Sequence, residues 1–76
     1  MIRKKKVERQ KSKIEKRVEA LPTAELLTWN EQAVYSLSRN LSNWQRSQDS
    51  FYLEEARVAA EVVHAIVNSI SERAIK

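Results

Sequence analysis

The 76-residue chain contains no glycine and only one proline, Pro22. Because glycine is the residue that most readily adopts positive φ, its absence disfavours the tight primed turns of β-hairpins. Glycine-rich phosphate loops, nucleophile elbows and dinucleotide-binding fingerprints are excluded, since each needs glycine where the backbone turns sharply or approaches its ligand. The sequence therefore predicts an all-α fold and removes several large classes of enzyme.

A chain of this length can build only one thin hydrophobic core. Folding of so short a chain buries only about 60% of the surface that its unfolded form exposes. Small folds usually gain further stability from disulfides, a metal ion or a partner chain. Cysteine is absent, which removes disulfides and thiolate metal sites together. A contact with a partner surface is the remaining source of stability.

Positive charge is concentrated at the start of the chain. Residues 1–17 hold nine cations and two acids, a difference of +7, whereas residues 18–76 hold five cations and eight acids, a difference of −3. The formal net charge of +4 thus combines a basic arm with a mildly acidic body. The nine cations of the arm are Arg3, Lys4, Lys5, Lys6, Arg9, Lys11, Lys13, Lys16 and Arg17.

The arm itself is predicted to be helical over residues 2–20, because it consists mostly of Lys, Arg, Glu and Gln. Its apolar residues form only a narrow stripe, which permits contact on one side. Pro22 ends this helix, since the residue before a proline is driven out of the α region. We therefore divide the chain into a basic helical arm, residues 1–20, and a second part, residues 21–76.

The second part is predicted to be an antiparallel helical hairpin with helices at about 24–46 and 51–73. Thr23 is the expected N-cap of the first helix, and Asp49 or Ser50 of the second. The polar connection between the helices is short, as is usual between antiparallel neighbours. The arm either stays separate from the hairpin or completes a three-helix bundle.

Each hairpin helix carries an apolar stripe with the a/d spacing of a helix–helix seam. The register pairs Leu41 with Ala56 and Leu27 with Ile70. Asn30 falls on the first seam, where it either fixes register or, as is more common, sits solvated at the seam edge. The first stripe is Leu27, Val34, Leu37, Leu41 and Trp44, and the second is Tyr52, Ala56, Ala59, Val63, Ile66 and Ile70.

The second hairpin helix has more apolar surface than one neighbour can cover. Val58, Val62 and Ala65 form a second stripe on another side of this helix. In one interpretation the basic helix covers that stripe. In the other, the stripe forms a docking surface with Trp29 for a second copy or a larger protein, because aromatic residues are enriched at interfaces.

The sequence offers little catalytic or metal-binding chemistry. Glu61 and His64 match the Glu-x-x-His spacing of di-iron bundles, but such a site needs two of these motifs and two further carboxylates. The pair falls on a polar helix face, where an ordinary solvated stripe is the simpler interpretation. No nucleophile–base arrangement is present. We expect a protein that is not an enzyme and that uses no cofactor and no metal.

The basic arm carries the stronger functional signal. Clustered cations neutralise phosphates and release counterions, which gives salt-dependent binding without sequence choice. The arm could equally lie on an acidic protein surface or extend into solvent. Membrane insertion is not expected, since no apolar run approaches the roughly 20 residues of a membrane span. No continuous apolar segment follows the basic start, so a secretory signal peptide is not expected either.

The segments Leu-Pro-Thr-Ala-Glu-Leu-Leu-Thr-Trp (21–29) and Glu-Glu-Ala-Arg-Val-Ala-Ala-Glu (54–61) give the chain a family resemblance. Over about residues 21–70 it resembles small helical accessory and virion proteins of actinobacterial bacteriophages. The resemblance implies a phage-encoded accessory or minor virion component, located in the virion or the host cytoplasm. It carries over no active residue, and it leaves the arm unassigned.

Two functional hypotheses follow. In the first, the chain is a structural or assembly protein that docks on a larger protein assembly, or on itself, through Trp29, Val58, Val62 and Ala65. Its arm then lies on an acidic protein surface or on nucleic acid. In the second, the chain is a small nucleic-acid-binding regulator that dimerises through the hairpin and grips phosphates with the arm.

Overall fold

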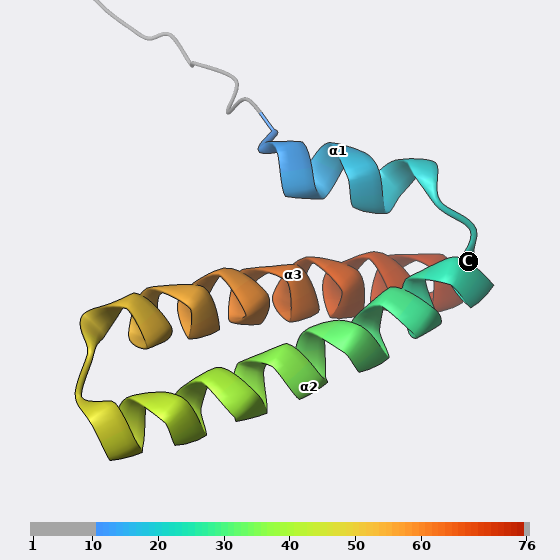
Figure 1. Ribbon diagram of the computed structural model, residues 1–76. Coiled ribbons are helices and arrows are strands. Elements are labelled where there is room, and N and C mark those ends of the chain that lie inside the picture. The colour runs from blue at the N-terminus through green and yellow to red at the C-terminus, as the bar shows by residue number, and fades with distance from the viewer. Residues whose placement is uncertain (1–10, 76) are drawn as a thin grey trace, which may run out of the picture.

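The computed structural model describes residues 11–75, and these form three α-helices (Figure 1). They are α1 (Lys13–Ala20), α2 (Thr23–Ser47) and α3 (Ser50–Ile75), and no strand occurs within this range. The prediction of an all-α fold with an antiparallel hairpin is confirmed. Both hairpin helices extend one or two residues beyond their predicted ends.

Helix α1 begins later than predicted, at Lys13. Ser12 forms a capping box: its Oγ accepts from the backbone N–H of Glu15 at 3.2 Å, and the carboxylate of Glu15 accepts from the N–H of Ser12 at 3.0 Å. A serine that satisfies these orphan donors stabilises a helix start at this point. Residues 2–10 of the predicted helix lie outside the described residues.

Helix α2 begins at Thr23, so the prediction of Thr23 as the N-cap is wrong. Pro22 takes that place, with an extended backbone (φ −67°, ψ 157°), and its carbonyl oxygen accepts from the N–H groups of Glu25 and Leu26 at 3.0 Å each. Proline fits just ahead of a helix because its ring fixes φ and it has no N–H to leave unpaired. The hydroxyl of Thr23 is therefore available to another partner.

Only Gln48 and Asp49 separate α2 from α3. Gln48 adopts the left-handed conformation (φ 60°) that usually requires glycine, and its N–H donates to the carbonyl oxygen of Trp44 at 2.6 Å. The Gln48 side chain also donates to the carbonyl oxygen of Gln45 at 3.2 Å. Asp49 caps α3, as predicted, because its carboxylate accepts from the N–H of Phe51 at 2.9 Å.

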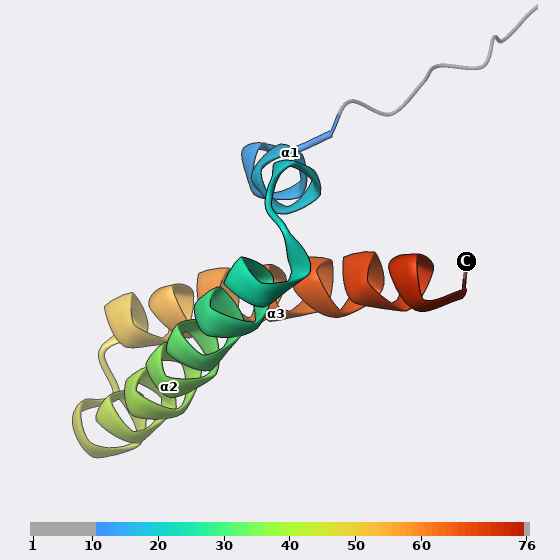
Figure 2. The ribbon, with the colours of Figure 1, turned by 90° about the vertical axis from the view of Figure 1, so that its right-hand side faces the viewer.

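One hydrophobic core joins all three helices, which confirms the three-helix alternative. Its buried members are Val18 from α1, Leu26 and Ala33 from α2, and Val62 and Ile66 from α3. Helix α1 lies on one side of the hairpin (Figure 2). Arg73 of α3 contacts Thr23 of α2, within one position of the predicted pairing of the two helices.

The predicted seam of α2 is wrong by one residue along most of its length. Leu27, Val34 and Leu41 are 51%, 45% and 44% exposed, whereas Leu26 and Ala33 are buried. The reason is α1, whose Val18 packs against Leu26 and thereby moves the core toward one flank of the hairpin. The opposite flank of α2 is left open to solvent.

Asn30 does not sit in the solvated position that was expected. The residue is half-buried, and its Oδ1 is buried without a hydrogen-bond partner among residues 11–75. A buried acceptor without a partner loses its hydration and gains nothing in exchange. Asn30 thus carries a buried acceptor on α2 that no donor of residues 11–75 satisfies.

Candidate functional site

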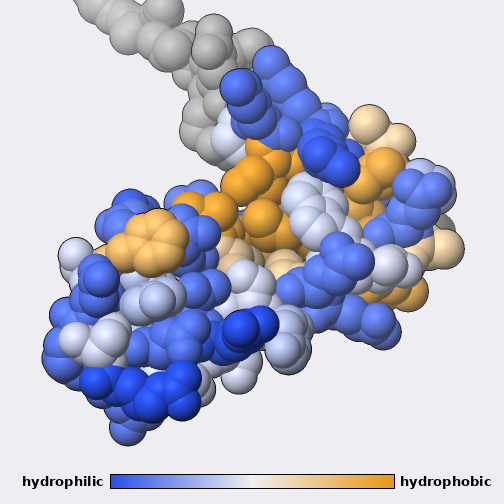
Figure 3. Space-filling view, viewed as in Figure 1, coloured by the Kyte–Doolittle hydropathy of each residue, from blue (hydrophilic) through white to orange (hydrophobic). Residues whose placement is uncertain are grey.

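The outer side of α1 is a basic ridge formed by Lys13, Lys16 and Arg17, all of them exposed. Val18 is buried beneath the helix, and Lys16 precedes it by two residues, which is about 200° around a helix. The side chain of Lys16 therefore points away from the core. Figure 3 shows hydrophilic atoms along this side of α1 and hydrophobic atoms below it. The cations Arg3, Lys4, Lys5, Lys6 and Arg9 of the predicted contact lie outside the described residues.

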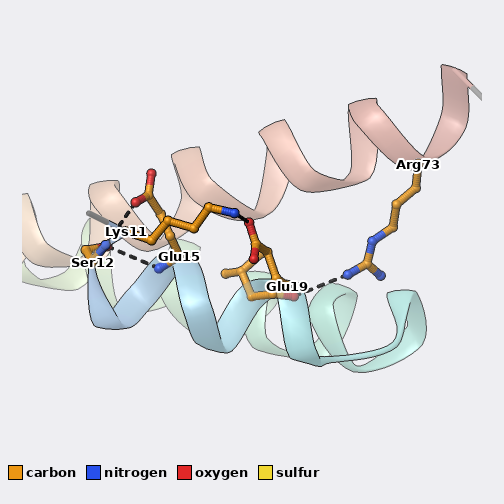
Figure 4. A network of polar contacts seen from close by, with 6 residues as sticks. Lys11, Ser12, Glu15, Glu19 and Arg73 are labelled. Carbon is orange, nitrogen blue, oxygen red and sulfur yellow. Dashed lines mark hydrogen bonds and ion pairs between the residues drawn. The ribbon is translucent and has the colours of Figure 1, made fainter. Parts of the chain in front are cut away.

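Lys11 differs from these cations because it forms an ion pair with Glu19 along the side of α1 (Figure 4). The hydrogen bond to Glu19 and its negative charge raise the pKa of Lys11 above the ordinary lysine value. The pair is exposed, so solvent screens it. Lys11 thus adds less to the basic ridge than its place in the sequence suggests.

Trp29 lies between α1 and α2. The guanidinium carbon of Arg17 is 5.2 Å from the centroid of the Trp29 ring, within the range of a cation–π contact. The indole also packs against the core. Arg17 and Leu21 line a shallow groove with Trp29. The prediction that Trp29 belongs to an open docking surface is therefore corrected, because α1 covers part of its ring.

Arg73 fastens the end of α1 to the hairpin. Its guanidinium donates to the carbonyl oxygens of Leu21 at 2.8 Å and Val18 at 3.2 Å, and to the hydroxyl of Thr23 at 3.0 Å. Figure 4 shows the side chain reaching from α3 to the C-terminal end of α1, where carbonyl groups lack helical partners. No local pattern in the sequence indicates this contact, which spans about fifty residues.

The predicted docking stripe of α3 is mostly covered by α1. Val62 is 8% exposed and belongs to the common core, and Ala65 packs against that core. Only Val58, at 49% exposed, remains open. Val62 and Ala65 are thus corrected from open surface to intramolecular contact, because Val18 and Ile14 of α1 occupy the place that a partner was expected to take.

A second apolar surface, open to solvent, lies on the other side of the hairpin. Trp29 and Ala65 mark the α1 side of α2 and α3, since both pack with the common core beside α1. Leu27 and Val67 are each two residues away from them, about 200° around their helices, and so lie on the opposite side. Leu27 is 51% and Val67 is 50% exposed.

We call this surface the open face. It consists of two rows of residues at seven-residue intervals, one on each helix, and a seven-residue interval keeps a row on one side of a helix. Every member is apolar, in a chain that is 42% hydrophobic. The rows are Leu27, Val34 and Leu41 on α2, and Leu53, Ala60, Val67 and Ala74 on α3.

The described residues show no arrangement suited to metal chemistry. His64 is exposed, with its Nε2 3.5 Å from the side-chain nitrogen of Asn68, and Glu61 is exposed beside it. Within residues 11–75 no group of three or more His, Cys, Asp or Glu side chains is placed to hold a metal ion. None of the described helices combines the length and the apolar character that crossing a bilayer requires.

Comparison of the chain with family models, curated proteins and solved structures gives no match. The geometry of the open face and of the basic ridge is therefore the basis for a functional proposal. The two surfaces lie on opposite sides of the hairpin, so one can be occupied while the other stays accessible.

Proposed function

We propose that the protein is a non-enzymatic structural component of a larger protein assembly, in which the open face makes a protein–protein contact. On the other side, the basic ridge of α1 contacts an acidic protein surface or nucleic acid. The resemblance to small helical phage proteins extends this proposal to a phage-encoded minor virion or accessory component, located in the virion or the host cytoplasm.

The observation that carries the proposal is the size of the open face relative to the core. Five large apolar side chains on this face are 44–51% exposed. Only four large apolar side chains are buried within residues 11–75: Val18, Leu26, Val62 and Ile66. Contiguous apolar patches on small soluble proteins mark interaction sites, because covering them releases free energy in proportion to their area. The open face therefore supports a protein-binding function.

The position of the basic ridge supports the second contact. Lys13 and Lys16 have no carboxylate within ion-pair distance in the described part of the chain, unlike Lys11. Arg17 is exposed although its guanidinium stacks on Trp29. Cations that are not neutralised within the fold attract anionic surfaces, with an affinity that depends on ionic strength.

Site-specific photo-crosslinking in the cells that naturally make the protein tests the docking. The benzophenone amino acid p-benzoylphenylalanine replaces Val67 on the open face or, as the matched control, Val58, which is equally exposed on α3 but faces the α1 side. We expect adducts with protein from position 67, co-sedimenting with the assembly, and few from position 58. Absence of adducts from position 67, or equal adducts from both positions, would contradict the proposal.

The basic ridge also favours a second candidate function, that of a nucleic-acid-binding regulator. Lys13, Lys16 and Arg17 project from one exposed helix, as side chains that contact phosphates must. A regulator binds duplex DNA as the purified chain, with affinity that falls steeply as salt rises. Fluorescence anisotropy with a labelled duplex, against poly-glutamate as an acidic competitor, distinguishes the two functions. Preference for the duplex supports the regulator, and equal competition supports general anion contact.

A further inference from the structure

We infer that a second copy of this chain occupies the open face. The two hairpins then pack face to face as two layers of two helices each, related by a twofold axis. The inference rests on the proposed function in one respect, that the open face is a protein contact. It goes further by naming the partner. Three features of the described residues carry it: the area of the face, the register of its two rows, and the small core behind it.

The area of the face matches what a stable dimer requires. Helix α2 has 25 residues and α3 has 26. At 1.5 Å per residue each is roughly 37 Å long, and two adjacent helices present a face roughly 20 Å wide. The resulting area of roughly 740 Å² is close to the roughly 800 Å² that each partner buries in an interface of standard size.

The two rows are complementary when the twofold axis runs parallel to the helices. Such an axis places α2 of one copy against α3 of the other, with all neighbouring helices antiparallel. The contact of Thr23 with Arg73 then sets Leu27 level with about position 69. That position lies between Val67 and Ala74 of the α3 row.

The same register continues along the face. Val34 comes level with about position 62, between Ala60 and Val67 of the second copy, and Leu41 comes level with about position 55, between Leu53 and Ala60. Each large residue of the α2 row therefore meets a gap that has an alanine on one side. Large side chains that insert between residues of a facing row give the knobs-into-holes packing of helical bundles.

The small core gives the chain a physical reason to dimerise. Folds of this size rarely reach useful stability from a single core without disulfides, metal or oligomerisation. The chain has no cysteine, and its buried large side chains number four in the described residues. Pairing of the open faces would add ten large apolar side chains, five from each copy, to a second core. Self-association covers the open face without any other gene product.

The dimer has a defined consequence for the basic ridge. Since α1 lies on the side of the hairpin away from the open face, the two α1 helices would lie on the two outer sides of the dimer. With helix layers 8–10 Å apart, their separation is roughly 30 Å. The two ridges would face opposite directions, which suits bridging two anionic surfaces and not gripping one.

Light scattering on the purified full chain tests the inference. We expect twice the chain mass of 8.9 kDa at micromolar concentration. Val67→Glu should raise the dimer dissociation constant by at least about 100-fold, because two unpaired carboxylates would be buried in each interface. Circular dichroism should show unchanged helix content, since Val67 is half exposed in the single chain. Val34→Glu on α2 should have the same effect and replaces the first variant if that fails to fold.

Val58→Glu is the matched control, with the same substitution on the same helix at a residue of equal exposure. This variant should remain dimeric. Any of three results overturns the inference. The wild-type chain is a monomer at about 200 µM, the Val67→Glu variant is a dimer, or the Val58→Glu variant is a monomer. Photo-crosslinking separates this failure from failure of the proposed function. If the chain is a monomer but still forms adducts with another protein from position 67, the dimer is ruled out and the open face remains a protein-binding surface.

Discussion

The guanidinium of Arg73 donates to the carbonyl oxygen of Leu21 at 2.8 Å, which joins the last turns of α3 to the end of α1. The same group donates to Val18 and Thr23, so one cation satisfies acceptors from α1, its connection and α2. A cation near the C-terminal end of a helix is also favoured by the helix dipole. This contact holds the basic ridge in place against the hairpin.

Arg73→Lys should therefore loosen α1 selectively. Lysine carries the charge but lacks the planar fork that reaches three acceptors at once. We expect a loss of about 1.5–3 kcal/mol in the free energy of unfolding, measured by urea titration, since hydrogen bonds to charged groups contribute about that much. Hydrogen exchange should rise first in α1. Arg57→Lys is the control on the same helix: its pairs with Glu54 and Glu61 are exposed, and stability should change by less than about 0.5 kcal/mol.

The left-handed conformation of Gln48 gives a second prediction. The left-handed backbone conformation is about 1 kcal/mol less favourable for a residue with a Cβ atom than for glycine. Gln48 adopts this conformation, and its side chain is exposed. Gln48→Gly should therefore raise the free energy of unfolding by about 0.5–1 kcal/mol, as measured by thermal or urea denaturation. Gln45→Gly, three residues earlier in helical conformation, should lower it by about as much. A loss of stability in both variants would show that the side-chain bonds of Gln48 outweigh its backbone strain.

The hairpin was predictable from the sequence because its signals are local. Pro22, the cap at Asp49 and the short polar connection each act within a few residues, and the repeating apolar positions of α3 mark its buried side. The start of α1 was missed, although the pattern Ser-x-x-Glu at Ser12 and Glu15 is a known helix-start signal. The run of good helix formers on both sides obscured it.

The flank that α1 covers could not be predicted in the same way. Leu26 and Leu27 are identical residues one position apart, and either could belong to the seam with α3. The choice depends on Val18, whose contact with the hairpin is a long-range packing event with a small sequence signal. Once α1 covers Leu26, Leu27 is left on the open face. Residues assigned to the core from sequence thus became the candidate site.

Asn30 gives a third prediction, because its buried Oδ1 has no hydrogen-bond partner among the described residues. Asn30→Leu removes this acceptor and adds apolar volume, so the free energy of unfolding should rise by about 1–2 kcal/mol in urea titration. Asn43→Leu is the control. Asn43 is also half-buried on α2, but its Oδ1 already accepts from Arg46 at 2.7 Å, so no comparable gain is expected. If Asn30→Leu were destabilising, overpacking at the seam would be the dominant effect.

The basic ridge gives the last prediction, which concerns salt and not stability. Lys13 and Lys16 are exposed and project from the outer side of α1, so each can neutralise one phosphate. For the double variant Lys13→Gln and Lys16→Gln, we expect the slope of log K against log salt for duplex DNA to become shallower by about 1.8, since each phosphate contact contributes about 0.9. Fluorescence anisotropy with a labelled duplex at several salt concentrations measures this slope. Arg39→Gln and Arg46→Gln remove the same charge from α2 and should leave the slope unchanged. An equal change in both double variants would show that net charge, and not the ridge, governs binding.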